Sequence, residues 1–558
     1  MSDAEATKPE DSQKPTAKKP FPRVALGFTI LVAALIVLSR LFASEIGDTI
    51  GLSPDVMAVC SYLLIVLVML TWGIWILFLS KRNWFMRIIM MLVLLGLPYG
   101  FLKVFRPVND GDAAIAYFKP IWEAERGVVE TEVEASENAI DLTTETPNDF
   151  AQFLGPNRNG IVSGQPGIAS DAINTQTEVV WKKPVGEGWS GFSARNGYAV
   201  TLEQRGDQEC VTCYEIATGK MVWIHEHQAR HRDAMGLGRL GPRATPTIHN
   251  GMVYSMGAMG HFVCLNGADG VPVWSKDMLE ILKIDSISGE ADGFQFQYED
   301  SQLAWGRSGS PLIVDDLVVV TGGGPRGGPF TTLLAFDAKT GELKWKGGDE
   351  MIAYGSPSLA TLAGKRQIVV VAETRAMGFD PETGEALWEH ERLGSSEGPA
   401  NCSQVTIVDE DHIILSKGYN MGGELVEVIN EEGKFSTESL ESNPRVLKTK
   451  LTSPVVVDGY AYTLSDGFLE CTDVEDLSRK WKRRGKFGHG QILLCGDKLL
   501  VHSESGTLFL IKATPDGFEE LGQMKTVEGV CWNNLCRFGE YLLVRSELEA
   551  ACIRLASE

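Results

Sequence analysis

The chain is short of positive charge for its length of 558 residues. It has 51 Lys and Arg residues against 73 Asp and Glu residues, a formal net charge of −22 at pH 7. Proteins that bind phosphate backbones present clustered basic side chains, so this balance argues against a nucleic-acid partner. The chain also lacks a Walker motif, an HExxH motif and any Ser/His/Asp order that would nominate a hydrolytic triad.

Adjacent cysteines are absent as well. The ten cysteines are all separated, which excludes a vicinal disulfide. Most lie in strand-like stretches, where a small buried side chain is expected. The spacing Cys210-Val-Thr-Cys213 suits a metal, but no second pair follows it. A disulfide between Cys531 and Cys536 is left open.

Long apolar runs are confined to the N-terminal region. Residues 1–20 are polar and rich in Lys and Pro, which predicts a disordered leader. Residues 21–43, 56–80 and 86–102 follow as three apolar runs and predict a transmembrane region over residues 21–103. A signal peptide is the alternative for the first run, but two further runs follow it at once.

Basic residues set the expected orientation. They gather before the first run and after the second, as Lys8, Lys14, Lys18, Lys19 and Arg23, then Lys81, Arg82 and Arg87. The loop between the first and second runs has none, so the leader is expected in the cytoplasm and the chain after the third run outside. The expected location is the inner membrane, multi-pass, with the C-terminal part facing the periplasm. If the third run re-enters at Pro98 instead of spanning, the C-terminal part is cytoplasmic.

Repeats organise the rest of the chain. Residues 104–148 are an acidic linker, which self-repulsion is expected to extend. Within residues 149–558 a hairpin ending in Trp recurs, as in LAFDAKTGELKW at residues 334–345, with Asp, Thr and Gly in its turn. An upstream start signal, such as GSPLIVDDLVVVTG at residues 309–322, adds two strands. Four strands per unit, recurring at roughly forty to fifty residues, predict β-propeller blades.

The fold class is therefore all-β: an eight-bladed propeller of four-stranded antiparallel blades after three transmembrane helices, with seven blades as the alternative. The last blade lacks its Trp strand, and residues 178–185, EVVWKKPV, are a candidate to complete it and close the ring. The repeated Trp is expected to pack between neighbouring blades. These blade-docking residues are Trp181, Trp223, Trp274, Trp345, Trp388 and Trp481.

The hairpins resemble the tryptophan-docking motif of the pyrroloquinoline-quinone (PQQ) repeat propellers, Ala-x-Asp-x-x-Thr-Gly-x-x-x-Trp, best at residues 335–345 and then 378–388. The segments QFLGPNRNG (152–160), GPRATPT (241–247) and WGRSGSPL (305–312) resemble bacterial PQQ-binding-like proteins, which are often named after the outer-membrane assembly factor BamB. The resemblance runs from about residue 150 to the C-terminus and implies a fold of the broad WD40/YVTN-like propeller type. It implies much less about activity.

Two branches of this family imply different functions. Quinoprotein dehydrogenases hold PQQ over the channel against a vicinal disulfide, with Ca²⁺ bound by Glu, Asn and Asp, and use a catalytic Asp. This chain has no adjacent cysteines and lacks the long insertions between blades, so we assign no catalytic residue, and PQQ with calcium remains an alternative. The BamB-like branch implies a plain ring that serves as a binding scaffold.

Ligands bind propellers at the channel mouth, and aligning the start signals puts a set of polar and aromatic residues near one rim. They are Trp189, Arg243, Arg307, Tyr354, Asn401, Lys450, His489 and Trp532. Their cations would suit an anionic ligand or an acidic peptide, and the plainer alternative is that they are only solvated. A histidine-rich segment adds a metal-binding hypothesis for His225, His227 and His231.

We therefore expect a membrane-anchored, extracytoplasmic scaffold that binds a protein or peptide and is not an enzyme. The first alternative is a PQQ-dependent quinoprotein oxidoreductase. The second is a domain that senses a carbohydrate or small molecule, to which only Trp189 and Trp532 point.

Overall fold

The computed structural model describes residues 22–112, 114–121, 132–133, 140–174, 177–232, 238–291 and 294–558. The chain forms two compact units. The first contains Met1–Ile46 and Pro54–Ala124, and the second contains Gly47–Ser53 and Glu125–Glu558. The leader expected at residues 1–20 lies outside the described residues.

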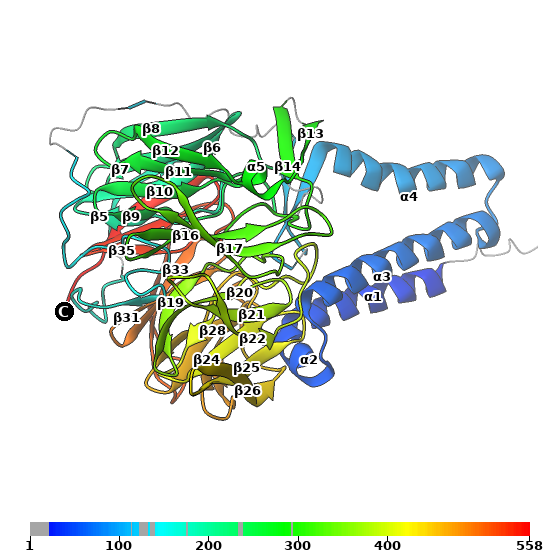
Figure 1. Ribbon diagram of the computed structural model, residues 1–558. Coiled ribbons are helices and arrows are strands. Elements are labelled where there is room, and N and C mark those ends of the chain that lie inside the picture. The colour runs from blue at the N-terminus through cyan, green and yellow to red at the C-terminus, as the bar shows by residue number, and fades with distance from the viewer. Residues whose placement is uncertain are drawn as a thin grey trace, which may run out of the picture. The chain divides into compact units, whose positions relative to one another are not determined.

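Apolar helices make up most of the first unit (Figure 1). They are α1 (Arg23–Leu41), α3 (Pro54–Ile74), the π-helical turn η1 (Trp75–Leu79) and α4 (Trp84–Val104), with the short α2 (Ala43–Ile50) after α1. Arg23–Leu41, Pro54–Leu79 and Trp84–Val104 are each long and apolar enough to cross a membrane, as expected for the three apolar runs. Trp72 on α3 donates its indole N–H to Thr29 Oγ1 on α1 at 2.9 Å, a polar bond between two apolar helices.

A hairpin follows the last helix. Strands β1 (Phe105–Asn109) and β2 (Ile115–Pro120) pair in an antiparallel manner inside the stretch that the sequence assigns to the linker. Asp110 accepts the backbone N–H groups of Asp112 and Ala114 at 2.9 Å and so fixes the turn. The first part of the expected linker is therefore a β-hairpin rather than an extended chain.

Eight blades, each a sheet of at least four strands, form the propeller of the second unit (Figure 1). Blades 1 and 2 are β5 (Ser193–Arg195), β6 (Tyr198–Arg205), β7 (Gln208–Glu215), β8 (Met221–Gln228), and β9 (Thr247–His249), β10 (Met252–Met256), β11 (His261–Asn266), β12 (Pro272–Asp277). Blades 3 and 4 are β15 (Leu312–Val314), β16 (Leu317–Gly323), β17 (Thr331–Asp337), β18 (Leu343–Gly347), and β19 (Ser358–Leu362), β20 (Lys365–Val371), β21 (Arg375–Phe379), β22 (Ala386–Glu391). Blades 5 and 6 are β23 (Thr406–Ile407), β24 (His412–Lys417), β25 (Gly422–Glu431), β26 (Lys434–Asn443), and β27 (Val455–Val457), β28 (Tyr460–Ser465), β29 (Phe468–Asp473), β30 (Arg479–Lys482).

Blades 7 and 8 include strands from the start of the propeller sequence. Blade 7 is β31 (Gln491–Cys495), β32 (Lys498–His502), β33 (Thr507–Lys512) and β34 (Glu520–Lys525), with β3 (Ile161–Val162) added parallel to β31. Blade 8 is β35 (Cys536–Phe538), β36 (Tyr541–Arg545), β37 (Glu549–Arg554) and β4 (Glu178–Pro184). The pairing of β4 with β37 confirms the predicted closure and the count of eight rather than seven.

Tryptophan docking explains the repeated hairpin. The Trp345 indole of blade 3 lies on the turn of blade 4, where it donates to the Pro381 carbonyl at 3.1 Å. A Cβ on Gly384 of that turn would stand only 2.5 Å from the ring. Trp223 lies on Gly270 in the same way, and Trp181 of the closing strand lies on Gly219 of blade 1. Glycine is therefore needed for close approach as well as for its positive φ.

The start signals join the blades near the axis. Their side-chain hydroxyls each accept a backbone N–H from the preceding blade: Thr245 from Gly191 at 3.1 Å, Ser310 from Thr245 at 2.9 Å, and Ser356 from Ser310 at 3.0 Å. Ser453 accepts from Gln404 in the same manner at 3.1 Å. These hydroxyls satisfy buried N–H groups that the short innermost strands leave unpaired.

The chain before β4 runs inside the ring. Phe150 and Ala194 exchange backbone hydrogen bonds at the free edge of β5, and Ala151 accepts from Ile248 at the free edge of β9. Farther on, β3 pairs with the free edge of β31. Between them, Arg158 donates to the carbonyls of Ser310 and Pro311 at 3.0 and 2.9 Å. Residues 150–162 therefore cross the channel and plug it.

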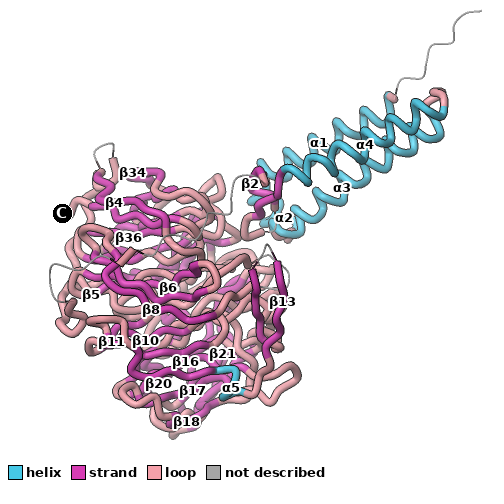
Figure 2. Tube along the Cα trace, turned by 90° about the horizontal axis from the view of Figure 1, so that it is seen from above, coloured by secondary structure: helices cyan, strands magenta, loops and turns pink. Residues whose placement is uncertain are grey.

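Two other elements decorate the ring. The short helix α5 (Met278–Leu282) follows blade 2, and Asp277 caps it by accepting from Leu279 and Glu280. The hairpin of β13 (Ser286–Ala291) and β14 (Phe294–Glu299) comes next and stands at the margin of the ring (Figure 2).

Candidate functional site

The eight candidate residues at the channel mouth come one from each blade. Each stands shortly before the innermost strand of its blade: Trp189 before β5, Arg243 before β9, Arg307 before β15, Tyr354 before β19, Asn401 before β23, Lys450 before β27, His489 before β31 and Trp532 before β35. They therefore lie at the end of the ring where these strands begin. The plug instead pairs with the strands themselves.

Most of these residues are buried and bond to the main chain. The Asn401 amide donates to the carbonyls of Ala372, Glu373 and Arg392 at 2.8–3.1 Å. Arg307 is 1% exposed; it bonds to the Gly322 carbonyl at 2.5 Å and pairs with Glu299 at 3.0 Å. Burial of a paired charge favours a structural role.

The buried set also includes Lys450 and His489. Lys450 Nζ lies 4.9 Å from the centre of the Tyr419 ring, and the His489 backbone N–H donates to Glu504 at 3.4 Å. Neither side chain is presented to solvent, so neither offers an open contact for a ligand.

Trp532, Arg243 and Tyr354 are the half-buried members of the set. Trp532 donates its indole N–H to Glu504 at 2.6 Å, and its ring lies 4.4 Å from that of the buried Trp189. Trp189 Nε1 and Arg243 Nη2 donate to the same carbonyl, that of Gly238, at 3.0 and 2.6 Å. This carbonyl joins the indole pair to the guanidinium group.

Tyr354 sits in a second aromatic pair. Its ring lies 5.4 Å from Trp305; its hydroxyl accepts the Trp305 backbone N–H at 3.1 Å and donates to the Ser396 carbonyl at 2.7 Å. Burial raises the pKa of Tyr354, so the hydroxyl stays protonated. Trp305 was missed by alignment on the start signals, although it lies in the quoted segment WGRSGSPL, two residues before Arg307.

Two titratable residues near Arg243 have strongly shifted pKa values. Burial raises the pKa of Glu209 to about 7, opposed by its hydrogen bond from the Ala258 N–H at 2.9 Å and by Arg243. Burial, and then the charge of Arg243, lowers the pKa of His231 to about 3. Near neutral pH His231 is therefore neutral, Glu209 is in the middle of its titration, and the Arg243 guanidinium is charged.

The three histidines of the metal hypothesis do not form one group. His225 and His227 lie on β8 and face His261 on β11. The centre of the His261 ring is 6.1 Å from that of His225 and 3.7 Å from that of His227. His231 instead lies against Gly306. In the described part of the chain, no group of three or more His, Cys, Asp or Glu side chains is arranged to hold a metal ion. The metal hypothesis remains a prediction without support from these contacts.

The residues at the mouth do not fit the PQQ and calcium set of the quinoprotein branch. All ten cysteines are free, including Cys531 and Cys536. The candidate amide Asn401 has its nitrogen committed to three carbonyls, and that of Asn533 beside Trp532 to two. The rim carboxylate Glu504 accepts from Trp532 and His489. No Glu, Asn and Asp cluster therefore assembles here among the described residues, and we derive no redox step.

The closed ring, its tryptophan–glycine seams and its internal plug define an eight-bladed, tryptophan-docked β-propeller. A sequence model of the family described as outer membrane protein assembly factor BamB matches residues 171–293 and 290–515. These matches cover more than half of the chain, and the protein belongs to this family.

Individual relatives come from both branches. The quinohemoprotein alcohol dehydrogenase ADH IIB of Pseudomonas putida is 24% identical over 159 residues, a match that spans 22% of this chain and 23% of that enzyme. The structure of the alcohol dehydrogenase ADHIIG from Pseudomonas putida HK5 aligns with a TM-score of 0.50 at 13% identity, over 76% of this chain and 83% of that chain. BamB of Moraxella catarrhalis aligns with a TM-score of 0.45 at 13% identity, over 68% and 98%. At 13% identity the ADHIIG structure supports the fold alone.

Proposed function

We propose that this protein is a membrane-anchored, extracytoplasmic scaffold whose propeller binds a protein or peptide at the channel mouth. The observation that carries the proposal is the half-buried group of Trp532, Arg243 and Tyr354, with Trp305 beside it. Aromatic and Arg side chains dominate the binding energy of protein interfaces. The membership of the BamB family supports a binding role for the same ring.

The membrane anchor consists of the three apolar helices. The distribution of Lys and Arg supports an inner-membrane protein with its propeller on the periplasmic side. Such a protein would present the mouth to partners outside the cytoplasm. The three helices differ from a lipid anchor, so outer-membrane assembly does not follow from the family alone.

Site-specific photocrosslinking in the intact membrane tests this function. A photoreactive residue replaces Trp532 in the full chain, and a matched one replaces Lys344 on the outermost strand of blade 3. We expect a discrete adduct from position 532 that position 344 does not give and that Arg243→Ala removes. Identical adducts at both positions, or no adduct at 532, would contradict the proposal. Arg307 is unsuitable for this test because its buried ion pair is part of the fold.

A PQQ-dependent oxidoreductase is the second candidate, and the names of the Pseudomonas putida relatives are what favour it. PQQ with Ca²⁺ added to the purified chain should raise the thermal midpoint if they bind only the folded state. A raised midpoint together with a quinone absorbance band retained after desalting would favour this candidate. We expect neither. The carbohydrate-sensing alternative is weakened because the Trp189 ring is covered by Trp532 and is 6% exposed.

A further inference from the structure

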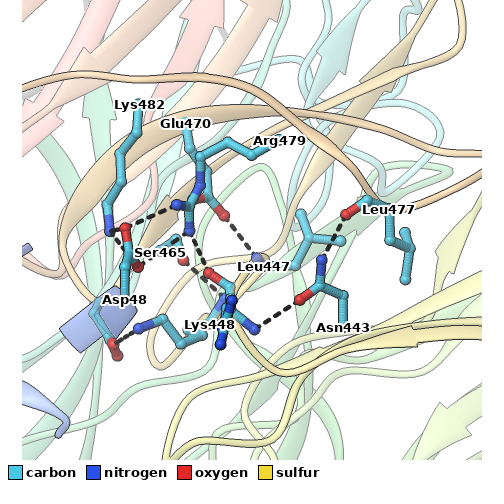
Figure 3. A network of polar contacts seen from close by, with 11 residues as sticks. Asp48, Asn443, Leu447, Lys448, Ser465, Glu470, Leu477, Arg479 and Lys482 are labelled. Atoms are coloured by element: carbon cyan, nitrogen blue, oxygen red, sulfur yellow. Dashed lines mark hydrogen bonds and ion pairs between the residues drawn. The ribbon is translucent and has the colours of Figure 1, made fainter. Parts of the chain in front are cut away.

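A cationic niche on blade 6 belongs to no part of the proposed binding site. It consists of Lys448, Asp466, Glu470, Arg479 and Lys482. Figure 3 shows Lys448, Glu470, Arg479 and Lys482 near the carboxylate of Asp48. Asp48 lies on α2, in Gly47–Ser53, the connection between α1 and α3 that belongs to the second unit together with the propeller and is called the loop below.

Two of the three cations of the niche have carboxylate partners on the blade itself. Lys448 Nζ lies 2.6 Å from Asp466, and Arg479 Nε lies 2.9 Å from Glu470. Lys482 has no ion pair with either carboxylate among the described residues, although its side chain is only 9% exposed. Glu470 acts on Lys482 electrostatically but is already paired with Arg479, so three cations share two carboxylates and the niche is incomplete without one more anion.

Asp48 supplies that anion. Its carboxylate lies 2.8 Å from Arg479 Nη1 and 3.2 Å from Lys482 Nζ. Burial alone would raise the pKa of Asp48, but Lys482 and Arg479 outweigh burial and lower it. The loop backbone is close as well, since a Cβ on Gly47 would stand 3.8 Å from Lys448 Nζ. The niche therefore fits a carboxylate carried by this loop.

We infer that the niche is an intramolecular docking site for the loop Gly47–Ser53, which consequently lies on the same membrane face as the propeller. Between this loop and the propeller the chain contains two apolar helices, Pro54–Leu79 and Trp84–Val104. If the loop and the propeller lie on the same side of the membrane, then either both of these helices cross it or neither does. Pro54–Leu79 has 26 residues and a mean hydropathy of 2.5, which is a spanning helix. Trp84–Val104 must then cross too, despite Pro98.

This inference is independent of what the mouth binds and of which face is periplasmic. It excludes the topology in which the third apolar helix re-enters the membrane without crossing it, which would put the propeller on the side opposite the loop.

Thiol accessibility in sealed vesicles tests the inference on the full chain. Single cysteines replace Leu52 in the loop, Lys434 in the propeller and Lys81 between the second and third helices, all in a Cys60→Ser background. The remaining native cysteines are buried or half-buried, and burial raises the pKa of the half-buried Cys402 to about 12, so they give little background labelling. A permeant reagent should label all three positions.

An impermeant reagent should label positions 52 and 434 from the same side and position 81 only from the other. Labelling of 52 and 434 from opposite sides would overturn the inference, and so would labelling of all three from one side. The ion pairs are tested by Asp48→Asn, with Glu45→Gln on the same short helix as the control. We expect Asp48→Asn to lower the thermal midpoint of the full chain by about 2–4 °C and Glu45→Gln to leave it unchanged. Equal midpoints for the two variants would count against docking through Asp48.

Discussion

The seams between blades fall into two groups around the ring. From blade 8 to blade 4, each seam has a Trp from one blade on the turn glycine of the next: Trp181 on Gly219, Trp223 on Gly270, Trp274 on Gly341 and Trp345 on Gly384. From blade 4 back to blade 8, no indole among the described residues meets a turn glycine in this way, although Trp481 of blade 6 still donates to the Thr514 carbonyl in the turn of blade 7 at 2.7 Å. Trp388 instead donates to Gln367 of its own blade at 2.5 Å and lies over its own Gly378.

The second group shows that the need for glycine in a turn depends on whether the preceding blade places a Trp on it. Blade 5 has no Trp in its outer strand, β26. At the matching turn of blade 6, the glycine is replaced by Leu477, which keeps a positive φ of 47°. Asn443 of blade 5 bonds to this turn in place of an indole: it donates to the Leu477 carbonyl at 2.9 Å, whereas the docking indoles donate to the carbonyl three residues before the turn glycine. At the seam between blades 5 and 6, the Trp and the turn Gly are therefore lost together.

Removing an indole from the first group should have the largest effect. Trp345→Ala leaves a cavity between blades 3 and 4 and an unpaired Pro381 carbonyl, which should lower stability by about 3–5 kcal/mol. Thermal unfolding of the full chain followed by circular dichroism measures the loss. Trp345→Phe keeps most of the apolar contact and should cost clearly less. A loss below about 1 kcal/mol for the alanine variant would show that the seam does not depend on docking.

The role of the turn glycine can be tested by comparing two glycines that have the same positive φ, only one of which lies under an indole. Gly384 and Gly364 both have φ of +74°, but a Cβ on Gly384 meets the Trp345 ring at 2.5 Å, whereas nothing lies within 4 Å at Gly364. Gly384→Ala should therefore cost about 2–3 kcal/mol more than Gly364→Ala, which bears the strain alone. In a Trp345→Ala background the two variants should become equal. A difference that persists there would assign the cost to something other than the indole.

The sequence predicts the fold because each blade carries, within one short hairpin, both the Trp that packs on the next blade and the turn glycine that receives the Trp of the previous blade. Turn and Trp occur in one hairpin, so each repeat carries both halves, and period-two alternation places the strands. The count of eight also follows, because Trp181 identifies the strand that blade 8 lacks. The plug at residues 150–162 could not be predicted, since it pairs with three strands far apart in sequence and has no repeat of its own.

The mouth was predicted by position but not by exposure. Alignment of the start signals gives one residue per blade, yet nothing in the sequence distinguishes the buried Arg307 from the half-buried Arg243. That difference depends on Glu299, contributed by the inserted hairpin, which pairs with Arg307. Glu209 was missed because its raised pKa comes from burial by tertiary packing, which outweighs the opposing hydrogen bond from the Ala258 N–H.

One seam of the first group should respond to pH. Between blades 1 and 2, the ring of His261 lies 3.7 Å from that of His227, and burial, then His227 and His225, lowers the pKa of His261 to about 4. Asp277 acts in the opposite direction and raises the pKa of His261 and His227, and Glu226 does the same for His225.

The folded pKa of His261 lies below the unfolded value of 6.5, so the unfolded state binds its proton first as the pH falls. Stability is intact above pH 6.5 and declines between pH 6.5 and 4. From pH 7 to pH 5 the contribution of His261 should fall by about 1–2 kcal/mol. Urea midpoints at the two pH values measure it, and His261→Gln should flatten the dependence relative to wild type. An unchanged slope in that variant would mean that other groups cause it.

The smallest expected effect lies in the second group of seams. Asn443→Ala removes the donor that replaces an indole and leaves the carbonyl of the buried Leu477 without this bond, which should cost about 1 kcal/mol. Asn430→Ala is the matched control, because the Asn430 amide also donates to a carbonyl, that of Ala363 at 3.1 Å, but at an exposed site where water can substitute. Thermal midpoints of the two variants in the full chain should differ, with Asn443→Ala lower. If they coincide, the seam between blades 5 and 6 is held by apolar packing alone, and the analogy between Asn443 and the docking indoles fails.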